Sequence, residues 1–225
     1  MKELRILQYN VNHGKEATLI PLLQDPRIKE FDILAIQEPW RNPFITTGYC
    51  PSNANFHLVY PPEHLARVSL YVNKRLHPDT WTVTYQSADA QTVTIRCDQD
   101  NGEEKTTIAI HNIYNPPPGS YNSQEPGTLE TLRKILNDLT TEHEHVVLGD
   151  FNLHHPLWSG IERLTQHKMA DHLIETAGNH GLSLATPRGT ITWRSRGLQS
   201  TIDLVFLSQR LETKLIKCIT RLDLT

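Results

Sequence analysis

Apolar residues recur every three or four positions in two segments, the spacing typical of helices buried on one face. The first helix is predicted to begin at Thr128, whose hydroxyl can cap it, and a second spans residues 167–179, with Gly181 just beyond its end. The expected inward residues of the two helices are Leu129, Leu132, Ile135, Leu136 and Leu139, and Met169, Leu173, Ile174 and Ala177. A third, weaker helix is predicted over 16–24, with Pro21 inside it.

Short apolar or alternating runs between these segments predict β-strands. Some runs are apolar on both sides, as strands covered on both faces are, and others alternate like half-exposed antiparallel strands. The predicted strands are 4–11, 31–38, 67–73, 81–86, 92–97, 106–114, 145–150, 200–207 and 214–220. Nine strands and three helices favour a layered α/β sandwich.

The length of 225 residues fits a single domain covering 1–225, since α/β chains of this size often form one core. The composition is ordinary for a globular protein, with 38% hydrophobic and 21% charged residues. The Pro/Gly/Ser-rich stretch 114–127 is interpreted as a surface loop, because a strand precedes it and a helix follows.

Charge and cysteine content exclude several classes of protein. The formal net charge of -3 argues against a generic basic nucleic-acid coat. The three cysteines, Cys50, Cys97 and Cys218, lack CxxC spacing and are expected to be free thiols in a reducing compartment. No signal peptide and no apolar run long enough for a membrane span is present, so we expect an intracellular protein, not secreted and without a membrane partner.

Polar side chains capable of phosphate or metal chemistry stand at the ends of four predicted strands. They are Asn10 and Asn12, Gln37 and Glu38, Asp150 and Asn152, and Asp203. One such residue alone is usually a solvated turn or a helix cap. Asp203 within "TIDLVF" is harder to dismiss, because a buried charge is costly unless paired. Side chains at i and i+2 of a strand share a face, so Asp150 and Asn152 can converge on one ligand.

The ordered motifs "QYNVN", "IQEPW", "NIYNPP", "GDFN", "TW" and "TIDLVF" cover nearly the whole chain. Together they resemble the endonuclease/exonuclease/phosphatase superfamily, which has the DNase I-like fold. "GDFNLHHPLW" is most similar to the endonuclease domain of LINE-type (non-LTR) retrotransposons. The resemblance implies a four-layered α/β sandwich, in which two packed mixed sheets are flanked by helices.

The resemblance also implies a role for each motif residue. Glu38 would bind a divalent metal, Mg²⁺ or alternatively Mn²⁺, with Asn10 beside it. Asp150 would orient or deprotonate the attacking water, and Asn152 would hold the phosphate or the nucleophile. Tyr114 would contact the scissile phosphate, and Asp203 would orient a histidine on the same phosphate. Many repair relatives carry an acid where this chain has Asn12, so one possible metal ligand is replaced.

Other residues near these motifs have weaker signals. His111, His154 and His155 lack zinc-type spacing, and His154 and His155 are interpreted as loop residues lining the cleft, where they can contact substrate. Arg194 and Arg196 form either an ordinary polar turn or a phosphate-contacting loop. Trp158 and Trp193 are predicted to be core or supporting residues.

The family pattern closes with a Ser-Asp-His stretch on a final strand, which this sequence does not reach before Thr225. Asp171-His172 lies in a predicted helix and is not taken for that motif. We therefore expect the final strand to be missing, in a fragment truncated at its C-terminus or a degenerate copy with weak or no activity.

These observations favour a metal-dependent endonuclease that nicks double-stranded DNA for retrotransposition. By family resemblance it would be nuclear, and a reverse transcriptase domain would accompany it in the full-length protein. Two alternatives remain open. One is a phosphoesterase of the same fold acting on inositol phosphates or lipids, and the other is a non-catalytic DNA-binding or assembly module.

Overall fold

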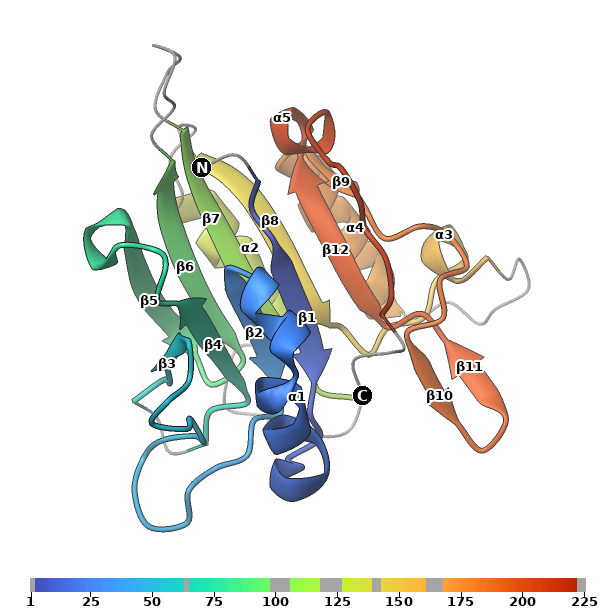
Figure 1. Ribbon diagram of the computed structural model, residues 1–225. Coiled ribbons are helices and arrows are strands. Elements are labelled where there is room, and N and C mark those ends of the chain that lie inside the picture. The colour runs from blue at the N-terminus through green and yellow to red at the C-terminus, as the bar shows by residue number, and fades with distance from the viewer. Residues whose placement is uncertain are drawn as a thin grey trace.

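The computed structural model describes residues 3–62, 65–97, 106–117, 127–138, 143–160 and 168–221. Two β-sheets pack face to face, with helices on their outer surfaces (Figure 1). The first sheet has the order β1-β2-β4-β3, and the second has the order β5-β6-β7-β8-β12-β9. The expected α/β sandwich of two mixed sheets is confirmed, because both parallel and antiparallel pairs occur within each sheet.

The strand bounds follow the predicted runs closely for eight of the nine segments. The first sheet contains β1 (Ile6–Asn10), β2 (Ile33–Gln37), β3 (Phe56–Val59) and β4 (Val68–Asn73). The second contains β5 (Trp81–Ser87), β6 (Ala90–Cys97), β7 (Thr106–Tyr114), β8 (His143–Asp150), β9 (Leu182–Leu184) and β12 (Asp203–Ser208). A separate hairpin joins β10 (Trp193–Ser195) to β11 (Leu198–Ser200).

All three predicted helical segments are helical. They correspond to a π-helix at Lys15–Leu19 continuing into α1 (Ile20–Gln24), α2 (Thr128–Asp138) and α4 (Lys168–Asn179). Pro21 is tolerated because it lies in the first turn of α1, where its missing N–H has no helical partner. The described part of the chain also contains two 3-10 turns, Pro26–Glu30 and Pro78–Thr80, and the short helices α3 (Pro156–Ser159) and α5 (Gln209–Glu212).

Alternation along the strands divides the interior into three apolar layers. In β2, Ile33 and Ala35 face the second sheet, whereas Leu34 and Ile36 pack beneath α1. A third layer joins the outer face of the second sheet to α2 and α4, and it contains the predicted inward residues Leu132 and Leu173. Burial on both faces explains why the β2 sequence is an unbroken apolar run.

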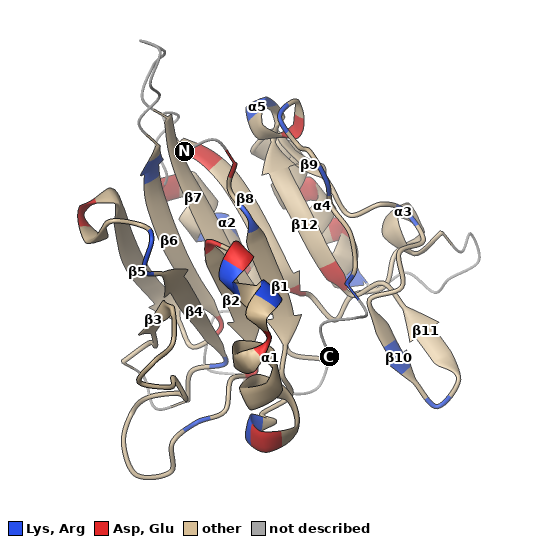
Figure 2. Ribbon diagram, in the orientation of Figure 1, with Lys and Arg blue, Asp and Glu red and all other residues tan. Residues whose placement is uncertain are grey.

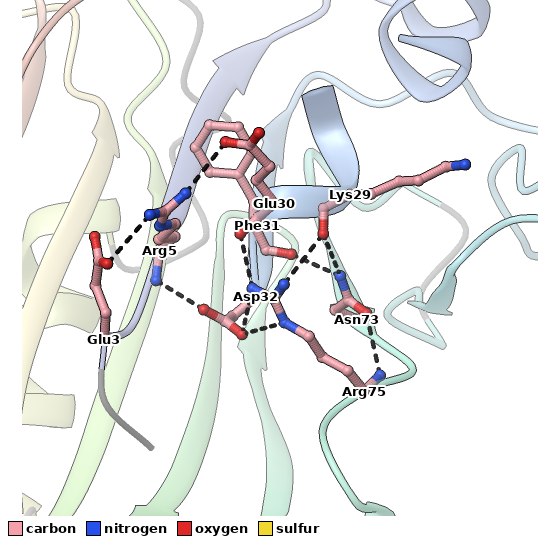
Figure 3. A network of polar contacts seen from close by, with 8 residues as sticks. All are labelled: Glu3, Arg5, Lys29, Glu30, Phe31, Asp32, Asn73 and Arg75. Atoms are coloured by element: carbon pink, nitrogen blue, oxygen red, sulfur yellow. Dashed lines mark hydrogen bonds and ion pairs between the residues drawn. The ribbon is translucent and has the colours of Figure 1, made fainter. Parts of the chain in front are cut away.

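A polar network fixes one end of the first sheet, opposite the end at which Asn10 and Gln37 lie (Figure 3). The buried carboxylate of Asp32 accepts the backbone N–H of Arg5 at 2.8 Å and the Nε–H of Arg75 at 2.8 Å. The Asn73 amide donates to the carbonyls of Lys29 and Phe31. These bonds join the beginnings of β1 and β2 to the end of β4, and so set the register of the three strands.

Three sequence-based expectations were wrong. Residues 215–220, within the ninth predicted strand, form no regular structure, and Ile216 and Ile219 are exposed. Trp193 is not a core residue, because 41% of its surface is exposed on the hairpin, whereas Trp158 is fully buried as predicted. Thr128 does not cap α2: it is the first helical residue, and its hydroxyl donates to the Asp89 carboxylate. Leu139 and the C-terminal residues 222–225 lie outside the described residues.

None of the three cysteines, all of which the structure describes, forms a disulfide, as predicted. No helix in the described part of the chain is long and apolar enough to cross a bilayer.

Candidate active site

Three neighbouring strands of the second sheet place Tyr114, Asp150 and Asp203 side by side. The parallel register of β7 and β8 pairs Tyr114 with Asp150, at the last residue of both strands. The antiparallel register of β12 pairs Asp203 with Asp150. In the facing sheet, β1 and β2 end together at Asn10 and Gln37, so Glu38 follows immediately (Figure 1). The sheet topology thus gathers side chains that are as much as 193 positions apart in sequence.

Asp150 is the centre of this group and is only 5% exposed. Its carboxylate accepts the side-chain amide of Asn10 at 2.9 Å and the backbone N–H of Asn152 at 3.1 Å. Burial raises the pKa of Asp150 to about 7, and the nearby carboxylates of Asp203 and Glu38 act in the same direction, whereas the two hydrogen bonds oppose the rise. A carboxyl group with this pKa can accept a proton near neutral pH.

Gly149 is required by the packing that brings Asp150 into place. Its φ is 150°, and a Cβ added there would lie 1.8 Å from the carbonyl oxygen of Ile113 on β7. Any side chain at this position would push β8 away from β7. The glycine of "GDFN" therefore holds the Tyr114–Asp150 pair in register.

Glu38 and Tyr114 join the two sheets at the same end of the sandwich. The Tyr114 hydroxyl donates to Oε1 of Glu38 at 2.8 Å, and His13 Nε2 lies 3.6 Å from the same oxygen. Burial raises the pKa of Tyr114, and the hydrogen bond to Glu38 adds to the rise, so this hydroxyl stays protonated and remains a donor. The Glu38 side chain keeps 20% of its surface exposed and can be reached by a ligand.

Backbone strain is concentrated at the same strand ends. Five non-glycine residues in the described ranges have positive φ, and four of them belong to this region: Asn12 (45°), His13 (57°), Glu38 (46°) and Asn152 (49°). Such conformations cost of order 1–3 kcal/mol each and persist only where the surrounding structure enforces them. At Glu38 the backbone is held by hydrogen bonds from its N–H to Arg67 and from His13 to its carbonyl.

Asn152 is fixed by a second asparagine. Its side-chain amide donates to the carbonyl of Asn115 at 3.0 Å, and the buried Asn115 amide donates to the carbonyl of Phe151 at 2.7 Å. Asn115 belongs to the "IYNPP" motif, so one function of that motif is to hold the "GDFN" turn.

Asp203 lies at the beginning of β12, partly exposed. Its carboxylate accepts the side-chain amide of Gln8 at 2.6 Å, and its backbone N–H donates to Thr192 Oγ1. Desolvation raises the pKa of Asp203, against the hydrogen bonds from Gln8 and Thr192, which lower it. Asp203 therefore has hydrogen-bond partners within the fold, and Thr192 of the "TW" motif contributes to holding it.

Three of the predicted substrate residues, Asn12, His154 and His155, follow the ends of β1 and β8. Asn12 lies in the turn after β1, where its N–H donates to Asn10 Oδ1. His155 caps α3 by accepting the Leu157 N–H at Nδ1, and its other nitrogen lies 3.6 Å from Asp171, so its ring is engaged in the fold, whereas His154 is exposed.

Arg194 and Arg196 are exposed residues of the β10–β11 hairpin, which begins directly after Thr192. Arg196 and Gly197 both have positive φ and form its two-residue turn. The segment from Trp193 to Ser200 contains no acidic residue.

Sequence reasoning missed two residues that contact the site. Arg67 pairs with Asp89 through two 2.5 Å hydrogen bonds, and its guanidinium lies 5.7 Å from the centre of the Tyr114 ring. Gln8, two positions before Asn10, shares its strand face and holds Asp203. The i, i+2 spacing of Gln8 and Asn10 was the available signal, whereas the Arg67–Asp89 pair depends on tertiary packing.

The oxygen donors at this end of the sandwich suit a magnesium ion that is held in part by its substrate. No group of three or more Asp, Glu, His or Cys side chains in the described ranges is arranged to hold a metal by itself. Mg²⁺ typically keeps several waters and is held by one or two carboxylates together with substrate phosphates. Glu38, partly exposed and already oriented by Tyr114, and the amide oxygen of Asn10 fit that sparse pattern.

Comparisons with known proteins agree with this arrangement. The endonuclease domain of TRAS1, a telomere-specific non-LTR retrotransposon, superposes with a TM-score of 0.70 at 18% identity, covering 99% of this chain and 93% of that one. An endonuclease/exonuclease/phosphatase family protein from Leptotrichia buccalis gives 0.58 at 15% identity, with coverage of 92% and 88%. The human Nocturnin catalytic domain gives 0.56 at 15% identity, with coverage of 92% and 83%.

No curated protein sequence matches the chain. At these identities the structural likeness shows the DNase I-like fold. The sequence family described as endonuclease-reverse transcriptase matches residues 108–223, which is more than half of the chain and includes Tyr114, Asp150 and Asp203. The chain therefore belongs to the endonuclease-reverse transcriptase family, a nuclease branch of the endonuclease/exonuclease/phosphatase superfamily.

Proposed function

We propose that this protein is a divalent-metal-dependent endonuclease that nicks double-stranded DNA. The observation that carries the proposal is the Asn10–Asp150–Asn152 cluster facing the Glu38–Tyr114 pair at one end of the sandwich. Family membership and the likeness to a retrotransposon endonuclease domain support a nuclease.

Asp150 acts as the general base for the attacking water. In the ionised form its carboxylate removes a proton from the water, whose oxygen forms a new bond to phosphorus while the bond to O3′ breaks. The departing O3′ takes a proton from solvent, so the products are a 5′ phosphate and a 3′ hydroxyl. Asn10 holds one carboxylate oxygen and the Asn152 N–H holds the other, so Asp150 is oriented by neutral donors that add no repulsion toward the phosphate.

Glu38 and Asn10 would hold the metal, Mg²⁺ or Mn²⁺. When bound there, it would supply positive charge that neutralises the phosphate and stabilises the departing oxygen. Tyr114 keeps the Glu38 carboxylate in one orientation, and its protonated hydroxyl lies where it can also donate to a phosphate oxygen. The amide of Asn152 supplies a second neutral polar group beside the phosphate.

Duplex DNA fits the surroundings better than a small phosphoester does. The β10–β11 hairpin projects beyond the strand ends and carries Arg194 and Arg196 without an acidic residue (Figure 2). Arginines outside a catalytic cluster commonly bind phosphates along a duplex and set its orientation. A reverse transcriptase in the full-length protein and a nuclear location follow from this assignment and belong to the proposal.

The decisive test is nicking of supercoiled plasmid with Mg²⁺ or Mn²⁺. We expect the chain to convert supercoiled DNA to open circles at a low rate, in line with the weak activity expected from its sequence. Glu38→Gln and Asp150→Asn should reduce that rate by at least about 100-fold, the usual scale for losing one catalytic donor or base. Glu212→Gln, in the exposed α5, is the matched control and should retain the wild-type rate.

Parallel assays with inositol phosphates separate the alternatives. Release of phosphate from these compounds without plasmid nicking would replace DNA by a small substrate. Absence of turnover on either, with DNA binding intact, would identify a non-catalytic module and overturn the proposal.

A further inference from the structure

Four side chains behind the candidate active site form a continuous line of hydrogen bonds across five strands. Asn112 on β7 bonds to Gln37 on β2 at 2.5 Å, and Gln37 bonds to Gln8 on β1 at 2.8 Å. Gln8 in turn donates to Asp203 on β12 at 2.6 Å. The line begins at the carbonyl of Ser69 on β4, which accepts from Asn112 at 2.9 Å. It therefore crosses between the two sheets and ends at a carboxylate of the site.

The direction of every bond in this line is determined by its first member. The Asn112 amide nitrogen donates to two backbone carbonyls, those of Ser69 and Ile36. A flipped Asn112 would place its oxygen against these two carbonyl oxygens, which cannot donate. Its oxygen must therefore face Gln37 and accept from it.

The same reasoning fixes the next two amides. Since the Gln37 nitrogen is used on Asn112, its oxygen faces Gln8, which must present its nitrogen. That nitrogen has two N–H groups: one bonds to Gln37 and the other to Asp203. Two backbone carbonyls at one end thus ensure that Asp203 at the other end receives a donor.

Because the amides are buried, flipping any of them would cost free energy. Gln37 and Asn112 are completely buried, and Gln8 is partly buried. A buried amide whose donors and acceptors are mismatched loses about 1–3 kcal/mol for each unsatisfied group. Neutral hydrogen-bonded chains in an interior of low dielectric also polarise one another. This line of amides is consequently rigid, whereas the side chain of an exposed glutamine would rotate freely.

We propose that Gln8, Gln37 and Asn112 form a one-way amide relay whose purpose is to hold the Asp203 carboxylate, and that Gln8 is its positioning residue. The effect on catalysis rests on the proposed endonuclease function. Asp203 is paired in register with Asp150, so a displaced or protonated Asp203 would alter the environment of the general base. Gln37 also precedes Glu38 directly, which connects the relay to the metal-binding side of the site.

The first arm of the test requires neither DNA nor metal. Carbon-13 NMR titration of the Asp203 carboxyl group should show its pKa raised in Gln8→Met, which has no donor. Gln8→Lys keeps N–H donors toward the Gln37 side-chain oxygen and the Asp203 carboxylate, so it should hold the Asp203 pKa at or below the wild-type value. The matched control is Gln91→Met: Gln91 is a buried glutamine that also bonds between the sheets, at 3.1 Å to Val59, but does not contact the relay. An unchanged Asp203 pKa in Gln8→Met would overturn the relay.

The second arm measures nicking and separates positioning from simple stability. Gln8→Met should lower kcat about 10- to 100-fold, as losing an outer-shell partner typically does, with KM little changed. Gln91→Met should lower thermal stability while leaving kcat at the wild-type value. In an Asp203→Asn background Gln8→Met should have no further effect on kcat, because its partner is already altered.

Equal stability losses in Gln8→Met and Gln91→Met with kcat unchanged in both would reduce Gln8 to a structural residue. If the wild-type chain nicks no DNA, the proposed function fails, and the NMR arm still decides whether the relay exists.

Discussion

Asp150 and Asp203 lie directly opposite each other on β8 and β12, so two carboxyl groups share one end of the sheet. Their charges repel, and burial raises the pKa of both. Placing them together lowers the stability of the metal-free protein, and this cost is what a bound cation would offset. Stability and activity are therefore expected to oppose each other at this position.

Replacing Asp150 by Asn should stabilise the metal-free protein above neutral pH. When folding raises the pKa of a carboxyl group, the stability that the protonated group contributes is complete below the pKa of the unfolded chain. It is lost as pH rises through the pKa of the folded protein, here about 7. At pH 8 the variant avoids a buried charge, so its stability relative to wild type should be about 1–3 kcal/mol more favourable than at pH 5, because each pKa unit corresponds to about 1.4 kcal/mol. Urea unfolding in EDTA at pH 8 and pH 5 measures the change. A gain of equal size at both pH values would contradict the electrostatic origin.

His111 should make the fold sensitive to acid. It is fully buried on β7, where Nδ1 contacts the Thr92 hydroxyl and Nε2 lies 3.3 Å from His145. Burial, together with smaller contributions from His145 and His143, lowers the pKa of His111 to about 3. The contribution of neutral His111 is present above pH 6.5 and is lost as pH falls toward 3, because the unfolded chain binds the proton first.

Unfolding free energies between pH 7.5 and 4.5 measure this effect. We expect His111 to lower the free energy of unfolding by about 1.4 kcal/mol for each pH unit below 6.5. His111→Gln, although less stable at pH 7.5, should flatten the slope. An undiminished slope in the variant would assign the acid sensitivity to other residues.

Several strands were predictable because both of their faces are buried, as in β2, or because polar and apolar residues alternate, as in β5. The segment 214–220 shows that such a pattern is insufficient, since its described residues pair with no strand and remain exposed. The three-residue strands β9, β10 and β11 are too short to show any period, and their existence depends on the partners they pair with.

The candidate site was predictable to the extent that its residues occur at strand ends in quoted motifs. Sequence order could not reveal the direction of the Asn112–Gln37–Gln8 line, because it depends on carbonyls of other strands. Nor could it show that Glu38 adopts a left-handed backbone or that His155 is used as a helix cap. These properties arise from packing between segments distant in sequence.

Tyr114→Phe tests whether Tyr114 orients Glu38. Losing the 2.8 Å hydrogen bond frees the carboxylate to rotate, so metal affinity should fall about 10-fold, the lower end for an outer-shell partner. Calorimetric titration with Mn²⁺ measures the affinity. Tyr71→Phe is the matched control: that buried tyrosine donates to the Tyr49 carbonyl away from the site, so its loss should reduce stability alone. Identical Mn²⁺ affinity in wild type and Tyr114→Phe would exclude the orienting role.

The β10–β11 hairpin should account for part of the salt dependence of DNA binding. A generic basic surface is absent, since the net charge is -3, so phosphate contacts must come from local groups such as Arg194 and Arg196. Each neutralised phosphate steepens the plot of log affinity against log salt by about 0.9. Duplex binding with Ca²⁺ between about 50 and 200 mM salt should therefore show a slope shallower by up to about 1.8 in Arg194→Ala/Arg196→Ala.

Arg133→Ala provides the control for this double variant. Arg133 is exposed and paired with Glu130 on α2, on the outer face of the second sheet (Figure 1). Its removal should leave the salt slope unchanged, because Arg133 is already paired with Glu130 and α2 lies away from the hairpin (Figure 1). If the double variant and the control had the same slope as wild type, the hairpin arginines would be ordinary turn residues, and the DNA path would have to run over another face of the sandwich.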